Sequence, residues 1–227
     1  MSPKPSLPGR SWVEGQAVTL YKFMEPQWAD ALVAGSSVRI GTLEDFRKSE
    51  MHQAGKTDPD EGTIKVKGRN SRLDIDIRNP LGKQLQKYGH NWTNSYIEDD
   101  GPVQMEVQIH NAYILSMARR SDPEVGLRID PKYTCCVEIK DPLKMAQEIT
   151  KSMQAKRVPL VNLSFRSVIY KERTIDETGE LDASVFIKGP QFKLDEEYRY
   201  AWYAKTYEKH VIVPFDPREC GLSIVRR

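Results

Sequence analysis

Short segments in which apolar and polar residues alternate recur along this chain, and this pattern constrains its fold more than any other. The alternation is clearest at residues 73–78, 103–109 and 197–204. Successive side chains of a strand point to opposite faces of a sheet, so each segment predicts a half-buried strand. Strands do not alternate regularly with helices, which favours an α+β fold with a mixed, mostly antiparallel sheet over a doubly wound fold.

Helical patterns are few. Residues 25–35 and 141–154 each begin with an acidic residue and a proline, which helices tolerate in their first turn, and each has an apolar face at helical spacing. Residues 43–47 predict a turn or a short helix. We therefore expect two or three helices in all.

The chain reads as one domain preceded by an arm. Residues 1–16 are rich in Pro, Ser and Gly and predict a flexible N-terminal arm, and residues 17–227 predict a single domain. Residues 79–102 have a mixed composition that predicts no element and would suit a substrate loop or an insertion. We expect a strand at residues 211–214 to complete the sheet.

Charge and cysteine usage bound the class of protein. The net charge of +2 neither indicates nor excludes a nucleic-acid partner. The three cysteines (Cys135, Cys136 and Cys220) lack disulfide or metal-ligand spacing, and the four histidines lie far apart, so we expect no metal site. Reduced thiols indicate the cytosol, and no apolar run approaches the roughly 20 residues of a membrane span. We expect a cytoplasmic protein without a membrane partner.

The segment 186–202 carries the strongest functional signal. Glu196 and Glu197 stand at the entrance of a strand that continues with alternating aromatic residues. Because they point to opposite faces, only one of them can enter a pocket on one face, which suits a site where a single carboxylate meets a sugar or a leaving group. The alternatives are a surface ion pair of Glu197 with Arg199, and aromatic side chains that either pack in the core or stack on bases.

Several motifs resemble a known family when they are taken in order. Residues 18–202 carry Leu20-Tyr21-Lys22-Phe23, then a helix, then Arg39-Ile40-Gly41-Thr42-Leu43-Glu44-Asp45-Phe46-Arg47, Asp58-Pro59-Asp60-Glu61, Ile114-Leu115-Ser116, Lys188 and Glu197-Tyr198-Arg199. This order is similar to that of an uncharacterised bacterial domain family with a final Glu-x-Glu-Tyr-Arg-like strand. It is similar more distantly to DarT-type toxins. The resemblance implies an ADP-ribosyltransferase-like domain with a split sheet.

The resemblance also assigns roles to residues. It places a catalytic glutamate at Glu197, and it places positions that bind NAD at Tyr21, Lys22, Arg47 and Ser116. DarT-type toxins usually carry histidine where Lys22 stands in this sequence. A lysine cannot accept a hydrogen bond, but it can meet a phosphate as a point charge.

The function implied is an NAD-dependent ADP-ribosyltransferase, with NAD as substrate, acting as a toxin or phage-defence effector. The acceptor would be a macromolecule, with RNA or single-stranded DNA favoured over protein, and a toxin implies an antitoxin or other neutralising protein. Two alternatives remain open. One is a catalytically inactive binding module of the same fold in a protein complex, which Lys22 in place of histidine favours. The other is an NAD glycohydrolase.

Overall fold

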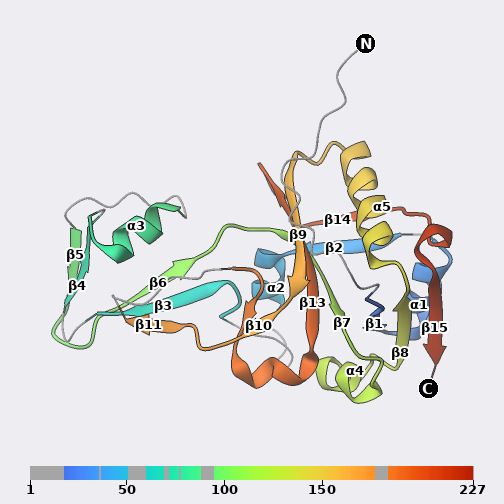
Figure 1. The fold of residues 1–227 in the computed structure, drawn as a ribbon, viewed down its shortest axis with the longest axis horizontal. Coiled ribbons are helices and arrows are strands. Elements are labelled where there is room, and N and C mark those ends of the chain that lie inside the picture. The colour runs from blue at the N-terminus through green and yellow to red at the C-terminus, as the bar shows by residue number, and fades with distance from the viewer. Residues whose placement is uncertain are drawn as a thin grey trace, which may run out of the picture. The chain divides into compact units, whose positions relative to one another are not determined.

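The computed structural model describes residues 18–35, 37–50, 60–68, 72–76, 78–87, 95–176 and 184–226 (Figure 1). The chain forms two compact units. The first comprises residues 1–46, 112–167 and 194–227, and the second comprises residues 47–111 and 168–193. The predicted arm at residues 1–16 lies outside the described residues.

The first unit is built on an eight-stranded sheet with helices on both faces. Its strands are β1 (Leu20–Met24), β2 (Val38–Thr42), β7 (Tyr113–Ala118), β8 (Cys135–Ile139), β9 (Leu160–Ser167), β13 (Glu197–Ala204), β14 (His210–Val213) and β15 (Leu222–Arg226). Its helices are α1 (Pro26–Val33), α4 (Pro123–Ile129), α5 (Pro142–Ala155) and the 3₁₀ turn η2 (Arg218–Cys220). Every ladder of this sheet is antiparallel.

Strand β7 has an unusual set of neighbours. One of its edges pairs with β13 along its whole length, from Trp202↔Tyr113 to Glu197↔Ala118. A strand has only two edges, so both remaining partners share the other one. There β2 pairs near the start of β7 (Gly41↔Ile114), and β1 pairs at its end (Tyr21↔Ala118). On this second edge, between the ladders to β2 and β1, the middle of β7 pairs with no strand among the described residues.

The main core lies on the face of the sheet that α5 covers. Alternation sends Tyr200 and Trp202 of β13 to this face, where both are fully buried. The Tyr200 hydroxyl donates to the Pro142 carbonyl at 2.7 Å, and Trp202 Nε1 donates to Thr150 Oγ1 at 2.8 Å. These bonds fix which way β13 faces, so its alternate residues, Glu197 among them, must point to the opposite face.

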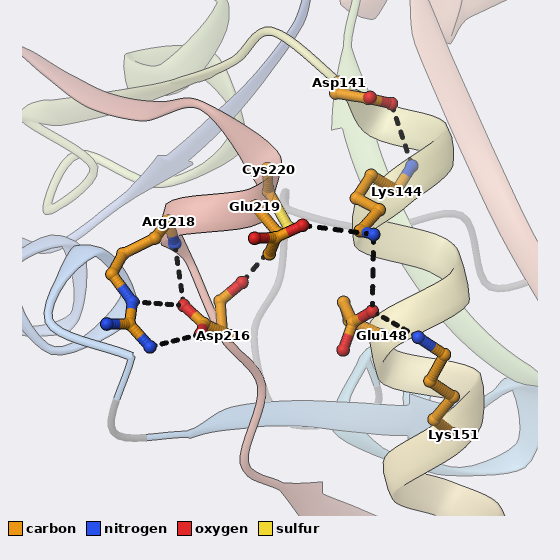
Figure 2. A network of polar contacts seen from close by, with 8 residues as sticks. All are labelled: Asp141, Lys144, Glu148, Lys151, Asp216, Arg218, Glu219 and Cys220. Atoms are coloured by element: carbon orange, nitrogen blue, oxygen red, sulfur yellow. Dashed lines mark hydrogen bonds and ion pairs between the residues drawn. The ribbon is translucent and has the colours of Figure 1, made fainter.

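Helix α5 is anchored at its first turns by polar contacts (Figure 2). The Asp141 carboxylate accepts from the Lys144 backbone N–H at 2.8 Å and caps the helix. Lys144 Nζ lies 3.2 Å from a carboxylate oxygen of Glu219 in η2, and Glu148 pairs with Lys151 at 2.6 Å. The Lys144–Glu219 contact links α5 to the turn that leads into β15.

The opposite face carries a smaller core beneath α4. Phe23, Ala118, Val125 and Cys136 are buried together there. Gly126 allows the close approach, because a Cβ at this position would lie 2.6 Å from Phe23 Cδ1. Alternating residues of β1 and β8 thus serve two separate cores on the two faces of one sheet.

The second unit consists of small sheets. Its strands are β3 (Thr63–Lys67), β4 (Arg72–Ile75), β5 (Ser95–Glu98), β6 (Gln104–Gln108), β10 (Ile169–Tyr170), β11 (Thr174–Asp176) and β12 (Ile187–Lys188). They form the sheets β11-β3-β6, β4-β5 and β10-β12, and two of the pairings, β11-β3 and β10-β12, are parallel. Helix α3 (Pro80–Lys87) belongs to this unit, whereas α2 (Leu43–Glu50) and the 3₁₀ turn η1 (Pro190–Asp195) span its boundaries.

The structure confirms an α+β fold with mostly antiparallel pairing, but the prediction of two or three helices is wrong. The described residues contain five α-helices. Helix α4 was missed because Gly126 interrupts a short pattern, and α3 was missed within the unassigned residues 79–102. The strand at 211–214 does not complete the sheet, because β15 follows it and pairs with β8. Among the described residues, no helix has the length and apolar character needed to cross a bilayer.

Candidate functional site

Four of the five predicted site residues lie on three strands of the first unit. Tyr21 and Lys22 belong to β1, Ser116 belongs to β7, and Glu197 belongs to β13. The register aligns Tyr21, Ala118 and Glu197 in one row across these strands, with Ala118 between the other two. Neighbouring strands lie about 4.8 Å apart, so the backbones of Tyr21 and Glu197 are roughly 10 Å apart.

The row lies on the face of the sheet that bears α4. Tyr21 packs beside the core beneath α4, and Ala118 is part of that core. Directly paired residues in a sheet share a face, so the Glu197 side chain lies on this face as well. The row therefore presents an aromatic ring and a carboxylate on either side of an alanine.

Lys22 enters the gap between β1 and β7. Its Nζ donates to the Ser116 carbonyl at 2.8 Å, at the part of the β7 edge that lies between the ladders to β1 and β2. Burial lowers the pKa of the Lys22 ammonium below 10.5, and the nearby Glu197 carboxylate opposes this shift. Lys22 and Ser116 are thus in contact although they are far apart in the sequence, and Glu197 acts on Lys22 electrostatically from β13, on the other side of β7.

Glu197 forms a buried ion pair with Arg199. Arg199 Nε donates to Oε1 of Glu197, and Nη2 lies 3.1 Å from Oε2, so the guanidinium holds both carboxylate oxygens. The side chains are only 2% exposed for Arg199 and 8% for Glu197. The pairing anticipated from sequence is present, but it lies in the interior and not at the surface.

Ser116 is half-buried, and the contact with Lys22 engages its carbonyl oxygen. It stands directly opposite Arg199 in the ladder between β7 and β13, and so shares the face of Glu197. The Ser116 side chain therefore lies on the same face of the sheet as Glu197, and its assignment to NAD binding stays a prediction.

Arg47 belongs to the second unit. Its Nε donates to the Glu61 carbonyl at 2.7 Å, and its Nη2 donates to the Gly62 carbonyl at 3.0 Å. These bonds hold the turn that leads into β3. The geometry within the second unit therefore gives Arg47 a structural contact, and its assignment to NAD binding stays a prediction.

The aromatic residues of β13 belong to the core. Tyr200 is 1% exposed and Trp202 is fully buried, and both contact α5. These two aromatic residues therefore pack in the core, as one of the two interpretations of the pattern predicts. Their burial excludes a base-stacking platform at these positions.

Sequence reasoning missed two residues of the site. Ala118 separates Tyr21 from Glu197, and no feature of the sequence marks it. Arg199 was considered only as part of a surface pair. Its spacing of two residues from Glu197 signals a shared strand face, but burial depends on the fold and is not visible in the sequence.

Comparisons of the chain with protein-family models, curated proteins and solved structures gave no significant match.

Proposed function

We propose that this protein is an NAD-dependent ADP-ribosyltransferase with an ADP-ribosyltransferase-like fold and a macromolecular acceptor. The observation that carries the proposal is the arrangement of Lys22, Ser116 and Glu197 about β7. Lys22 of β1 donates to the Ser116 carbonyl at the divided edge, and Glu197 of β13 lies across the other edge. These are three of the positions to which the resemblance assigns NAD binding and catalysis, and they come from three separate strands.

The chemistry calls for a carboxylate at this place. Cleavage of the bond between nicotinamide and ribose develops positive charge on the sugar, and an ionised carboxylate stabilises that charge, as in glycosidases. Glu197 has the right chemistry, and its interior position strengthens such an interaction. Tyr21 supplies an aromatic surface for a flat ring, and the Lys22 ammonium supplies positive charge.

The transfer breaks one bond at ribose C1 and forms another. The bond between ribose C1 and nicotinamide nitrogen breaks, nicotinamide leaves with the bonding electrons, and a nucleophilic atom of the acceptor bonds to C1. The proton of that nucleophile passes to Glu197 or to water. With water as the nucleophile the same step would make the protein an NAD glycohydrolase.

The resemblance to DarT-type toxins favours a nucleic acid as acceptor, with RNA or single-stranded DNA ahead of protein. It also suggests the role of a toxin or phage-defence effector in the cytoplasm, held in check by a neutralising protein. To identify the acceptor, the protein is incubated with NAD labelled in its adenylate part and with separate pools of RNA, single-stranded DNA and cell protein. We expect label in one nucleic-acid pool. Free ADP-ribose alone would replace transfer with hydrolysis.

A binding module without catalysis is the second candidate. It is favoured by Lys22 in place of histidine. Thermal denaturation with and without NAD separates the two, because a ligand at a hundred times its dissociation constant adds about 2.7 kcal/mol to the free energy of unfolding. No shift in the melting temperature and no label in any pool would favour the binding module.

A further inference from the structure

The Arg199 side chain occupies a defined position relative to the candidate carboxylate. Both residues are on β13, two positions apart, and therefore on the same face. The hydrogen bonds from Tyr200 and Trp202 to α5 fix which face of β13 points to the main core. The direction in which Glu197 and Arg199 point is thus set by the main core.

The contact is a fork in which two guanidinium nitrogens meet two carboxylate oxygens. Such pairs fix orientation as well as charge. A carboxylate offers about four lone-pair positions, so the fork by itself does not use up its capacity to accept from a sugar hydroxyl. A second cation, Lys22 of β1, interacts electrostatically with Glu197 from the far side of β7.

A buried ion pair is by itself weak evidence of a role in stability. Burying two charges costs desolvation energy, and well-packed apolar residues of similar volume are often as stable or more stable than a buried ion pair. An arginine at this place does, however, favour the ionised state of the carboxylate, which burial would otherwise oppose. An ionised and oriented carboxylate is what stabilisation of a positively charged sugar requires.

We propose that Arg199 is a positioning residue that keeps Glu197 ionised and correctly oriented for the reaction. The inference rests on the proposed function, because it gives Arg199 a purpose only if Glu197 acts on a substrate. Arg199 itself is not assigned a contact with NAD.

The test compares Arg199→Lys and Arg199→Met with the wild-type protein. Nicotinamide release is measured as a function of pH, and the Glu197 carboxyl carbon, labelled with ¹³C and assigned with Glu197→Gln, is followed by NMR over the same range. Arg218→Met is the matched control, since Arg218 makes the same kind of fork with Asp216 two residues away but is 87% exposed.

In Arg199→Met we expect the acid limb of the activity profile and the midpoint of the carboxyl titration to move up together by about one pH unit or more. In Arg199→Lys the charge remains but the fork is lost, so the acid limb should stay near its wild-type pH while the maximal rate falls about tenfold or more. Arg218→Met should match the wild type in both readouts.

The inference is overturned if Arg199→Met titrates like the wild type and loses activity only in proportion to its unfolded fraction. If Arg199→Met does not fold, Arg199→Lys decides, because a full maximal rate in that variant contradicts a positioning role. If the wild-type protein releases no nicotinamide, the proposed function fails. The carboxyl titration then still shows whether Arg199 controls the ionisation of Glu197.

Discussion

At the scale of single residues, removing one partner of the Glu197–Arg199 pair should lower the free energy of unfolding much more than replacing both partners with apolar residues. Arg199→Met removes the guanidinium that holds both oxygens of a buried carboxylate, and we expect a loss of about 3–5 kcal/mol in the free energy of unfolding. The double variant Glu197→Leu with Arg199→Met removes both charges and should recover most of that loss. Urea denaturation of the single and double variants measures the coupling. Additive losses would contradict a tight pair.

Tyr200 predicts how stability depends on alkaline pH. Burial raises its pKa well above 10.0. Above about pH 10 the unfolded chain loses this proton while the folded protein keeps it, so the unfolded state binds fewer protons and the free energy of unfolding falls as pH rises. Tyr200→Phe should lower stability near pH 7 by about 1 kcal/mol, through loss of the bond to the Pro142 carbonyl.

The same variant should flatten the decline in stability between pH 10 and pH 11, which denaturation at a series of pH values would show. An unchanged slope would mean that Tyr200 is not the group responsible.

Lys22 acts in the opposite direction, because its lowered pKa makes its contribution to stability increase as pH rises toward 10.5.

The sequence predicted several site residues but not their burial. The sequence order of the motifs selected Tyr21, Lys22, Ser116 and Glu197, and the fold places them on β1, β7 and β13, with Lys22 bonded to the Ser116 carbonyl. Alternation along β13 correctly placed Glu197 and Arg199 on one face. Alternation says nothing about which face is covered, so the burial of that pair depended on contacts that only the folded chain reveals.

At the scale of elements, helix α5 depends on its cap. Asp141→Ala removes the acceptor for the Lys144 backbone N–H and should cost about 1 kcal/mol in the free energy of unfolding. Asp141→Asn is the matched control, since asparagine caps as well as aspartate, and it should cost much less. Equal losses in the two variants, measured by urea denaturation, would show that charge and not capping matters at this helix.

Helix α4 depends on a close approach to β1. A Cβ at Gly126 would lie 2.6 Å from Phe23 Cδ1 and 2.9 Å from the Tyr133 carbonyl oxygen. Gly126→Ala should therefore destabilise the protein by about 1–3 kcal/mol despite the better helix propensity of alanine. Thermal denaturation tests this, and a variant as stable as the wild type would refute the close packing of α4 on Phe23.

Elements with a regular pattern were easier to predict than short or interrupted ones. The strands at 104–108 and 197–204 follow the alternation, and α5 follows its apolar face and its proline. Helix α4 has only seven residues with a glycine among them, and β15 follows residues 214–221, which contain two prolines and carry no strand pattern. Their packing partners, and not their local sequences, determine them.

At the scale of the whole molecule, the chain passes between its two compact units four times, at 46/47, 111/112, 167/168 and 193/194. No change in composition marks these positions, so a division of this kind was not visible in the sequence. The first unit holds Tyr21, Lys22, Ser116 and Glu197, and therefore every contact on which the proposed chemistry depends.

The most direct test of that chemistry is the rate at which purified protein releases nicotinamide from NAD in the presence of its acceptor pools. Glu197→Gln removes the charge of the carboxylate with little change in size, and we expect it to lower the rate by about 100-fold or more. Glu196→Gln is the matched control, because this neighbouring carboxylate is 39% exposed and pairs with Arg120. It should release nicotinamide at the wild-type rate. Equal rates for the wild type and folded Glu197→Gln, or no release by the wild type, would contradict the proposal that Glu197 cleaves NAD.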